Sequence, residues 1–534
     1  MRRLARDVLL MAVATGASRL LGLAREAAIA HRFGASAAYD AFLIAFFVPH
    51  FLRSLLAEGA LSTAFVPIYT RLRVGGAKGS LGDSSTEYQE ANEARLHNGA
   101  DAACQDSDRF ASNLLSLLLI FFPVTVVVGI LLAPAYVPFL ASGFPAEKLS
   151  LAVTLARIVF PFIALIGLAA VFMGVLNARH RFFPASFAPV WFNVGMIVGV
   201  LVVSPAFPHQ PILGLALGVL IGGAGQLLSQ LPALRRLGFR FRFTLLPLHP
   251  AVREFGNRMA PAVVILAVAQ INLLVDNKIA SHLPDGGIAA LQYAMRLFQL
   301  PLGVFAVSIA TALLPRLSAA WARGETGRFS RYLGDGFIAS AFVLLPAMVG
   351  LLVIGHDIIC LLFEHGSFGP SDTVRTAGAL SAYALGLLPY GLVYVQTRAC
   401  YALGRTTLPL LACVGAVGVN VALDLILVGP MREAGLSLAT AGAGLVNAII
   451  LFAFLRSSMR WSREQGRHLL AIGVGSALLA GVVFGTRQAI GGDIPALAVA
   501  VPTLAGILLY LLYARWSGLW SVVGGFGRSS EPNG

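Results

Sequence analysis

Long apolar runs recur along the chain from residue 8 to residue 516, separated by short polar stretches. An α-helix needs about 20 apolar residues to cross a bilayer. The pattern predicts about fourteen membrane-spanning helices. They lie at 8–31, 36–70, 111–133, 149–175, 184–204, 211–232, 252–281, 286–315, 330–354, 376–402, 407–429, 435–456, 466–486 and 493–514. A membrane β-barrel is excluded, because its strands would alternate over about 10 residues.

The second and eighth of these segments are longer than one span requires. We expect bends at Pro49 and Pro301, because proline lacks the backbone N–H that continues a helix. Composition supports the membrane assignment, since 57% of residues are hydrophobic and only 12% are charged. A soluble chain would carry about twice that charged fraction. The fold class is therefore all-α and integral to the membrane.

The net charge of +14 raises the question of nucleic-acid binding, but its distribution indicates membrane orientation instead. Of the 39 Lys and Arg residues, 26 lie on one side of the predicted helices, five on the other and eight inside them. Lys and Arg concentrate on the cytoplasmic side of membrane proteins. We therefore expect both termini to be cytoplasmic and no nucleic acid to bind. The four cysteines show no paired ligand spacing.

A weak internal repeat divides the chain. The sequence STAFVP at 62–67 recurs as ATALLP at 310–315, and the Ile-Ala at 29–30 recurs at 279–280. Six helices would lie in each half, so both copies keep the same orientation and form parallel repeats. Paired halves are what alternating access requires. The predicted domains are an N-terminal lobe at 1–232, a connector at 233–250, a C-terminal lobe at 251–457, two extra helices at 458–516 and a cytoplasmic tail at 517–534.

Two polar segments differ from the rest. Residues 74–108 are rich in acids and small polar residues, and we expect a disordered cytoplasmic insertion there. The connector 233–250, ALRRLGFRFRFTLLPLHP, alternates Arg with Phe and Leu. This amphipathic pattern predicts a segment at the membrane surface, held by anionic lipid, in preference to an RNA-binding patch.

Charged residues inside the apolar segments are the main functional signal. An arginine at mid-bilayer depth costs about 2.5 kcal/mol or more, so such residues usually face a cavity and pair or bind a ligand. The bases are Arg19, Arg25, Arg53, Arg157, Arg258, Lys278, Arg296 and Arg398, and the acids are Glu26, Asp40, Glu58, Asp276 and Asp424. For Arg258 and Arg398, which lie near helix ends, pairing with an acid or with lipid headgroups is the better explanation. For Arg53, pairing and ligand binding are equally good explanations.

Arg19, Arg25 and Arg296 lie deeper and favour ligand binding. Arg19 and Arg25 are six residues apart, which places them about 120° apart on a straight helix and about 9 Å along its axis. Gly22, between them, would permit a bend that brings them together. Because the guanidinium fork suits bidentate phosphate, a cavity rich in arginine indicates a phosphate-bearing substrate.

A second group of residues suits a hard cation. Asn420 and Asp424 are at positions i and i+4, on one helical face. Asp276 and Thr440 could join them across the second half, which would give two carboxylates, an amide oxygen and a hydroxyl. The alternative is that Asp276 pairs with an arginine. Its neighbour Lys278 is a poor partner, because residues i and i+2 do not face each other on a helix.

At this point the sequence resembles a known family. The stretches ASRLLGLAREAAIAHRFGASAAYDAF and FLRSLLAEGALSTAFVPIY are similar to the N-terminal signature of the MurJ-type (MviN) lipid II flippases. These belong to the multidrug/oligosaccharidyl-lipid/polysaccharide exporter superfamily. The resemblance extends from residue 5 to about residue 515. It implies fourteen helices, with a lipid-tail groove formed by the last two. It also implies transport of undecaprenyl-diphosphate-linked disaccharide-pentapeptide across the inner membrane for cell-wall synthesis.

The resemblance also assigns residues. The family's essential cavity arginines match Arg19, Arg25 and Arg296, and further sensitive positions match Arg53, Asp40 and Glu58. A sodium site known in some members matches Asp276, Asn420, Asp424, Thr440 and the carbonyl of Leu436. Two departures stand out: Met295 precedes Arg296 where some members have an acid, and the loop 74–108 is longer than usual.

The resemblance implies no enzymatic activity and no cofactor beyond sodium as a coupling ion. The expected partners are the lipid II substrate, membrane lipids and the cell-wall synthesis machinery, with the protein a monomer. A multidrug/cation antiporter of the same superfamily is one alternative, although its cavity would be acidic or apolar. A flippase for another undecaprenyl-diphosphate-linked oligosaccharide is the nearest alternative, because only the N-terminal signature separates it. A lipid-linked glycosyltransferase would need a catalytic domain outside the membrane.

Overall fold

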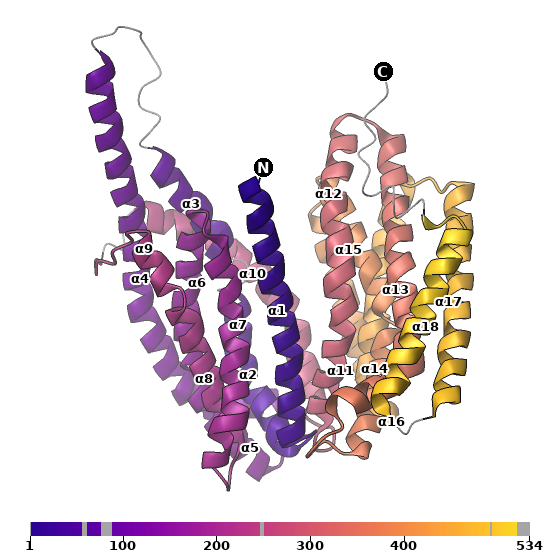
Figure 1. The fold of residues 1–534 in the computed structure, drawn as a ribbon. Coiled ribbons are helices and arrows are strands. Elements are labelled where there is room, and N and C mark those ends of the chain that lie inside the picture. Colours follow the sequence, from indigo (N-terminus) through magenta and orange to yellow (C-terminus); the bar gives the residue numbers. More distant parts are fainter. Residues whose placement is uncertain (1, 56–60, 76–87, 246–249, 492–493, 521–534) are drawn as a thin grey trace. The chain divides into compact units, whose positions relative to one another are not determined.

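The computed structural model describes residues 2–55, 61–75, 88–245, 250–491 and 494–520 (Figure 1). This described part of the chain consists of helices and the turns between them, with no strand. The all-helical class expected from the apolar runs is confirmed. The chain divides into two compact units. Unit 1 comprises Met1–Ile29 and Ala37–Leu274, and unit 2 comprises Ala30–Ser36 and Val275–Gly534.

Unit 1 contains α1 up to Ile29, all of α2 to α9 and most of α10. They are α1 (Arg2–Phe33), α2 (Ala37–Leu55), α3 (Leu61–Gly75), α4 (Tyr88–Leu140), α5 (Ala146–Val159), α6 (Phe162–Ala178), α7 (Phe182–Val198), α8 (Ile212–Leu228), α9 (Leu231–Arg236) and α10 (Pro250–Ala280). The helix α3 packs on α4 and α6, and α2 packs on α5. The stretch Ala146–Ala178 is the most enclosed, with 61% of its most apolar window buried. It therefore forms the centre of this unit.

The helices α7 and α8 pack backbone against backbone. Glycines recur every four residues on α8, at Gly214, Gly218 and Gly222. A Cβ atom added to Gly218 would lie 2.9 Å from the carbonyl oxygen of Gly195 and 2.9 Å from the Cα atom of Gly199. Spacing of small residues by four is the usual device for close helix packing in membranes, where lipid offers no hydrophobic drive. A larger side chain here would separate the two helices.

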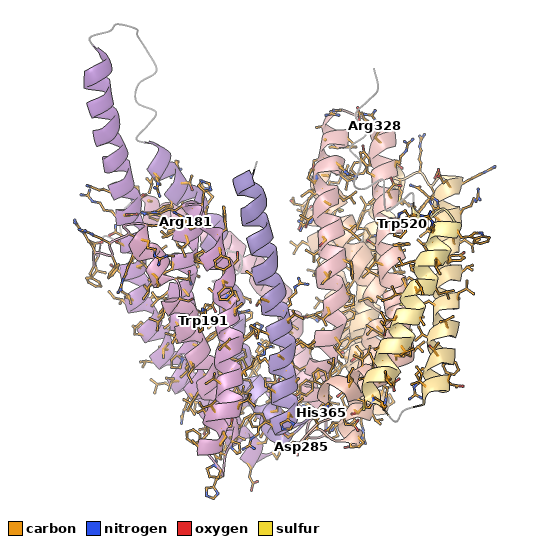
Figure 2. The ribbon with its side chains drawn as sticks, in the orientation of Figure 1. Arg181, Trp191, Asp285, Arg328, His365 and Trp520 are labelled. Atoms are coloured by element: carbon orange, nitrogen blue, oxygen red, sulfur yellow. The ribbon has the colours of Figure 1, made fainter. Side chains whose placement is uncertain are left out.

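Unit 2 contains the end of α10 and eight further α-helices. They are α11 (Gly287–Pro301), α12 (Val307–Ala322), α13 (Thr326–Phe363), α14 (Pro370–Ala384), α15 (Leu387–Ala402), α16 (Thr407–Leu455), α17 (Arg463–Ile490) and α18 (Pro495–Trp516). The last two helices pack on each other and on α13, where the buried core includes Ile338 and Ile472. Figure 2 shows Asp285 and His365 at one end of this unit and Arg328 and Trp520 at the opposite end.

Nine continuous helical stretches among the described residues are long and apolar enough to cross a membrane, and the bent pair α14–α15 makes a tenth. One of the nine, Thr407–Ser458, is 52 residues long. Its backbone breaks at Arg432 (φ 49°, ψ −124°), between the predicted segments 407–429 and 435–456. A single span needs about 20 residues, so this stretch has the length of two. The other predicted segments fall on the more polar helices α1, α2–α3 and α10, and the total of fourteen spans stays a prediction.

The two prolines at which bends were expected lie in different local structure. The helix α11 ends at Pro301 and is followed by one wide turn of π-helix, Leu302–Ala306, before α12 begins. A π-turn accommodates the missing N–H and the displaced carbonyl, so the helical stretch Gly287–Ala322 continues past Pro301, and the bend there stays a prediction. The helix α2, in contrast, continues through Pro49. The long segment 36–70 is instead divided into α2 and α3, with residues 56–60 outside the described part.

The expectation of disorder over 74–108 is wrong from Tyr88 onward, because residues 88–108 form the beginning of α4. Figure 1 shows this beginning of α4 projecting beyond α3 and α6. The sequence there contains five Ala, two Glu and two Gln residues, which favour helix. Elongating the apolar helix that follows also avoids the cost of a new nucleus. Residues 76–87 lie outside the described part of the chain.

The two compact units divide inside α10, between Leu274 and Val275, and near the end of α1, between Ile29 and Ala30. The lobes expected at 1–232 and 251–457 stay a prediction. Side chains tie the first part of α10 to unit 1. Arg71 donates to Glu254 (Nη1 to Oε1, 3.0 Å), and Gln270 donates to the hydroxyl of Ser54 at 3.4 Å. These contacts come from residues distant in sequence, so the apolar pattern could not reveal them.

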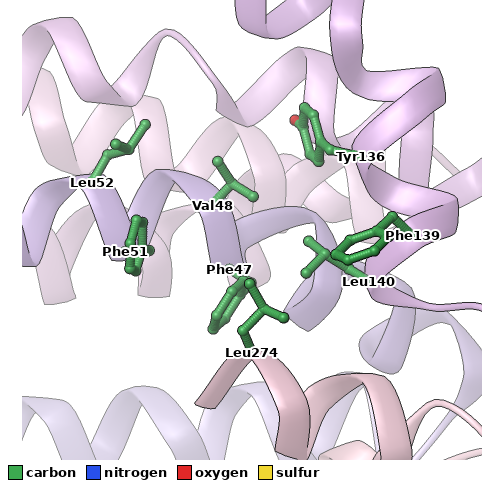
Figure 3. A pocket seen from close by; sticks show the side chains of 8 residues that line it. All are labelled: Phe47, Val48, Phe51, Leu52, Tyr136, Phe139, Leu140 and Leu274. Atoms are coloured by element: carbon green, nitrogen blue, oxygen red, sulfur yellow. The ribbon is translucent and has the colours of Figure 1, made fainter. Parts of the chain in front are cut away.

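An apolar pocket of about 210 Å³ lies in unit 1 between α2 and α4. Figure 3 shows its lining: four residues of α2 beginning at Phe47, three of α4 beginning at Tyr136, and Leu274 of α10. No charged side chain is among these eight. The pocket therefore does not coincide with the arginine-rich site predicted from the sequence.

Candidate functional site

Arg25 lies on α1 with its side chain buried against α7. Its Nη1 donates to Asn193 Oδ1 at 3.0 Å, and its Nη2 forms an ion pair with the adjacent Glu26. Tyr39 of α2 donates to the same Glu26 carboxylate at 3.3 Å. Arg25 therefore has an acid partner, Glu26. Asn193 and Tyr39 hold the two neighbouring side chains together although positions i and i+1 diverge on a helix.

One atom of the Arg25 guanidinium is left over in this arrangement. Its Nε is buried and has no hydrogen-bond partner. A buried polar group that makes no hydrogen bond is costly, so such a group marks a place where a ligand atom can bind with gain. Nε and one Nη together form the edge of the guanidinium that binds an oxyanion bidentately.

The other unit 1 arginines differ in exposure. Arg19 is exposed while Arg25 is 9% exposed. This difference agrees with the 120° separation expected on a straight helix, and α1 continues through Gly22 without a break. Arg53 of α2 is half-buried, and its guanidinium carbon lies 5.9 Å from the ring centroid of Phe192. Arg25 and Arg53 thus interact with consecutive residues of α7, Asn193 and Phe192.

Asp40 has a different environment from the arginines. Its carboxylate is 1% exposed and accepts a hydrogen bond from Lys148 Nζ of α5 at 2.8 Å. Lys148 also lies over the ring of Phe144, 4.1 Å from its centroid. The carboxylate is therefore committed to a buried ion pair between α2 and α5, which indicates a structural role. Glu58, the other acid assigned with it, lies outside the residues whose side chains are described.

Arg296 lies on α11 in unit 2 and is half-buried. One turn earlier, the amide oxygen of Gln292 accepts from Arg296 Nε at 3.3 Å and Nη2 at 3.0 Å, in the amide orientation that satisfies both groups. Met295 stands at the position where an acid was noted as missing. Gln292 is a neutral acceptor, so it orients the guanidinium without cancelling its charge.

The predicted cation-site residues come together in unit 2. Asn420 Nδ2 donates to Asp276 Oδ1 at 2.9 Å and to Asp424 Oδ2 at 2.7 Å. Asn420 and Asp424 are each 1% exposed. The alternative that Asp276 is committed to an arginine is not what these contacts show. One amide therefore bridges two carboxylates that the sequence places 148 residues apart, at 276 and 424.

Thr440 and Leu436 lie on the second half of α16. The two halves run side by side in opposite directions, since a Cβ on Gly435 would lie 2.3 Å from the Leu427 carbonyl oxygen and one on Gly442 would lie 2.9 Å from the Leu423 side chain. Residues 436–440 are therefore level with Asp424. Thr440 donates to the Leu436 carbonyl at 3.0 Å, and Tyr390 donates to the Thr440 carbonyl at 3.3 Å.

This group of residues fits a hard cation. Asn420 Oδ1 and Asp424 Oδ1 are buried and have no hydrogen-bond partner. The donor set contains only carboxylate, amide, hydroxyl and carbonyl oxygens, which are the ligands that hard cations prefer. The amide oxygen of Asn420 and one carboxylate oxygen of Asp424 are therefore available as ligands for a cation.

Three residues of these sites were not assigned by sequence reasoning. Asn193 is a polar residue inside an apolar helix, which is by itself a signal of function or pairing. Glu26 was recognised as an acid within a span but was not linked to Arg25. Lys148 precedes the predicted segment 149–175 and was not assigned to a site, whereas its side chain is buried. Only the packing of α5 on α2 reveals its partner.

Comparison with known proteins identifies the family of the chain. The family model "Lipid II flippase MurJ" matches residues 29–524. A probable lipid II flippase MurJ of Thermotoga maritima is 32% identical over 514 residues, which is 96% of each chain. A solved structure titled lipid II flippase MurJ, inward closed conformation, superposes with a TM-score of 0.77 at 28% identity and covers 95% of this chain and 98% of that one.

A more distant structure shares the fold alone. An inward-facing multidrug resistance MATE transporter of the MOP superfamily superposes with a TM-score of 0.61 at 16% identity, over 82% of this chain and 94% of that one. The family match covers nearly the whole chain, and the relative from Thermotoga maritima is similar along 96% of its length. The chain therefore belongs to the MurJ family of lipid II flippases.

Proposed function

We propose that this multi-pass membrane protein moves lipid II, the undecaprenyl-diphosphate-linked disaccharide-pentapeptide precursor of peptidoglycan, from the cytoplasmic to the periplasmic leaflet. Family membership supports the substrate class. The single observation that carries the proposal is the buried Arg25 guanidinium, which keeps Nε without a partner. An uncompensated diphosphate would be very costly in a low-dielectric interior, and a guanidinium fork compensates it.

Glu26 has a defined part in this proposal. Its carboxylate neutralises Arg25 and accepts from Tyr39 when no substrate is bound. A diphosphate carries more negative charge than one carboxylate and presents more acceptor oxygens, so it can take the guanidinium edge from Glu26. Asn193 would hold the guanidinium in place during this exchange. Arg19, Arg53 and Arg296 would add positive charge, with Arg53 held against Phe192 and Arg296 by Gln292.

The lipid tail would run along α17 and α18. Leu504, Leu508 and Leu512 of α18 are 67%, 61% and 58% exposed and recur every four residues, so they form one apolar stripe. Such a stripe suits an isoprenoid chain, which has no polar group to hydrogen-bond. This assignment follows the family and places the diphosphate, not the tail, at the arginines.

We further propose that Asp276, Asn420 and Asp424, with the Thr440 hydroxyl and the Leu436 carbonyl, would hold sodium as a coupling ion. The bound ion would supply the positive charge that two neighbouring carboxylates lack. Without it, the carboxylates repel each other or take up a proton. The buried Asn420 Oδ1 and Asp424 Oδ1 support this assignment. Transport by alternating access, with both termini cytoplasmic, completes the proposal.

The test is flipping of fluorescent lipid II by the purified protein in liposomes. Arg25→Lys and Arg296→Lys should each reduce the rate at equal protein content, because an ammonium cannot replace a bidentate fork. Arg398→Lys is the matched control, since its guanidinium lies 6.0 Å from the Tyr401 ring and a lysine keeps that interaction. Full activity of both Arg25→Lys and Arg296→Lys would contradict the proposal, and efflux of cationic drugs without lipid II flipping would favour the antiporter.

A further inference from the structure

Backbone hydrogen bonds to serines of α4 fix the position of the segment that follows α9. Residues 237–245 continue from α9 without helix, along α4. The backbone N–H of Arg242 donates to the Ser112 hydroxyl at 3.3 Å, and that of Thr244 donates to the Ser116 hydroxyl at 3.0 Å. Both serines are buried. We refer to residues 235–245 as the surface strap.

The start of the strap is also fixed by polar contacts with unit 1. Arg179, at the end of α6, donates to the Leu237 carbonyl at 2.8 Å and forms an ion pair with Asp108 of α4. The Phe239 side chain is 9% exposed and packs inward. The strap therefore has a fixed path over unit 1, and its remaining side chains project from a rigid support.

The exposed side chains of the strap combine positive charge with apolar rings. Arg235, Arg236, Arg240 and Arg242 are all exposed, and no acid occurs between residues 231 and 245. Phe241 and Phe243 are 44% and 60% exposed. Along this non-helical segment the rings of Phe241 and Phe243 alternate in sequence with Arg240 and Arg242. Arg181, labelled in Figure 2, adds a further exposed base two residues after Arg179.

The depth of the strap can be read from α4. Leu119, Ile120 and Phe121 are 39%, 47% and 54% exposed, and they begin the lipid-facing part of this helix. They follow Ser116 by three to five residues, which is about 5–7 Å along a helix axis. The headgroup layer outside the hydrocarbon core is about 5–7 Å thick. The strap therefore lies where lipid phosphates are, with its rings able to reach the hydrocarbon.

We propose that the surface strap is a binding site for anionic phospholipid headgroups, with Arg240 and Arg242 contacting the phosphates and Phe241 and Phe243 anchored among the acyl chains. Lys and Arg distribution assigns this side of the membrane to the cytoplasm, whose leaflet attracts basic segments. Each arginine at such a surface contributes roughly a fivefold preference for anionic lipid. The site is separate from Arg25 and does not depend on the transported substrate.

The experiment uses the full chain in nanodiscs of mixed phosphatidylglycerol and phosphatidylcholine. Trace lipids with a photoactivatable group near the headgroup, one with each headgroup, label the protein, and mass spectrometry of its fragments locates the labelled residues. We expect the phosphatidylglycerol probe to label the strap peptide in excess over the phosphatidylcholine probe. Arg240→Gln/Arg242→Gln should lower this ratio by roughly 25-fold, at two arginines of about fivefold each.

Controls separate charge at the strap from charge in general. Arg323→Gln/Arg405→Gln removes two exposed arginines elsewhere and should leave the strap ratio unchanged. Arg235→Gln/Arg236→Gln, on α9, provides a second strap variant if the first does not fold. Equal labelling by the two probes, or an unchanged ratio in both strap variants, would overturn the proposal. Loss of phosphatidylglycerol labelling on adding soluble diphosphate would show a site for a free anion instead.

Discussion

Neutralising Asp40 tests whether this buried carboxylate supports the fold or contacts the substrate. The Asp40 and Lys148 side chains are 1% and 5% exposed, and the ion pair joins α2 to α5 at 2.8 Å. Removing one partner of a buried ion pair costs about 3–5 kcal/mol, because the other charge stays buried without compensation. We therefore expect Asp40→Asn to lower the free energy of unfolding by about that amount.

The double variant Asp40→Asn/Lys148→Met removes both charges. It should recover most of the loss, since replacing a buried pair by uncharged groups is often close to neutral. The remaining deficit should be about 1–3 kcal/mol, from an amide that lacks a partner. The control is Glu325→Gln, whose partner Arg328 is 59% exposed. Breaking that surface pair should cost less than about 1 kcal/mol.

The measurements are unfolding by denaturing detergent and growth of a strain depleted of its own flippase. If Asp40 is structural, stability and growth return together in the double variant. A double variant that unfolds like the wild type but supports no more growth than Asp40→Asn would refute the reasoning. In that case the carboxylate contacts the substrate directly, and its pairing with Lys148 would be secondary.

Three further outcomes are expected. Gly218→Ala should destabilise the protein by about 1–3 kcal/mol, because the added Cβ would lie 2.9 Å from the α7 backbone. The control Gly481→Ala has open space around it and should be neutral or stabilising. Equal effects of the two variants on unfolding in detergent would argue against close α7–α8 packing. Asp424→Asn should slow flipping in liposomes and abolish any difference between sodium and choline buffers, since it removes one of two neighbouring carboxylates; a wild-type rate would exclude coupling at this site. The Ser367 hydroxyl donates to the Arg32 carbonyl at 3.1 Å, so cysteines at these two positions should form a disulfide crosslink. The crosslink should block flipping until reductant is added. Undiminished flipping by the crosslinked protein would rule out separation of these segments during transport.

Several features follow from the sequence with little need for tertiary structure. The length and apolarity of the runs determine that the chain is helical and spans a membrane, because lipid satisfies no backbone hydrogen bond. The six-residue spacing of Arg19 and Arg25 determines that they face different directions, and the structure confirms it by their exposure. The four-residue spacing of Asn420 and Asp424 likewise places both on one face, where they are hydrogen-bonded at 2.7 Å.

Other features depend on contacts that no local pattern encodes. Arg25 is paired with Glu26, although adjacent side chains on a helix point in different directions. The pair forms because Asn193, 168 residues away in sequence, accepts a hydrogen bond from the guanidinium. Asp40 was assigned to the substrate site, yet Lys148 from another helix binds it. The division inside α10 likewise arises from pairing with Arg71 and Ser54, far earlier in the chain.

The physical reason is the range of the interactions. Helix formation and membrane insertion depend on the backbone and on the lipid, which act on each segment of about 20 residues separately. The partner of a buried charge depends on which helix packs beside it, and small residues such as those of α7 and α8 decide that packing. The sequence by itself therefore determined which segments are apolar enough to span the membrane. Only the tertiary structure decided that Arg25 Nε is left without a partner, whereas the Asp40 carboxylate is paired with Lys148.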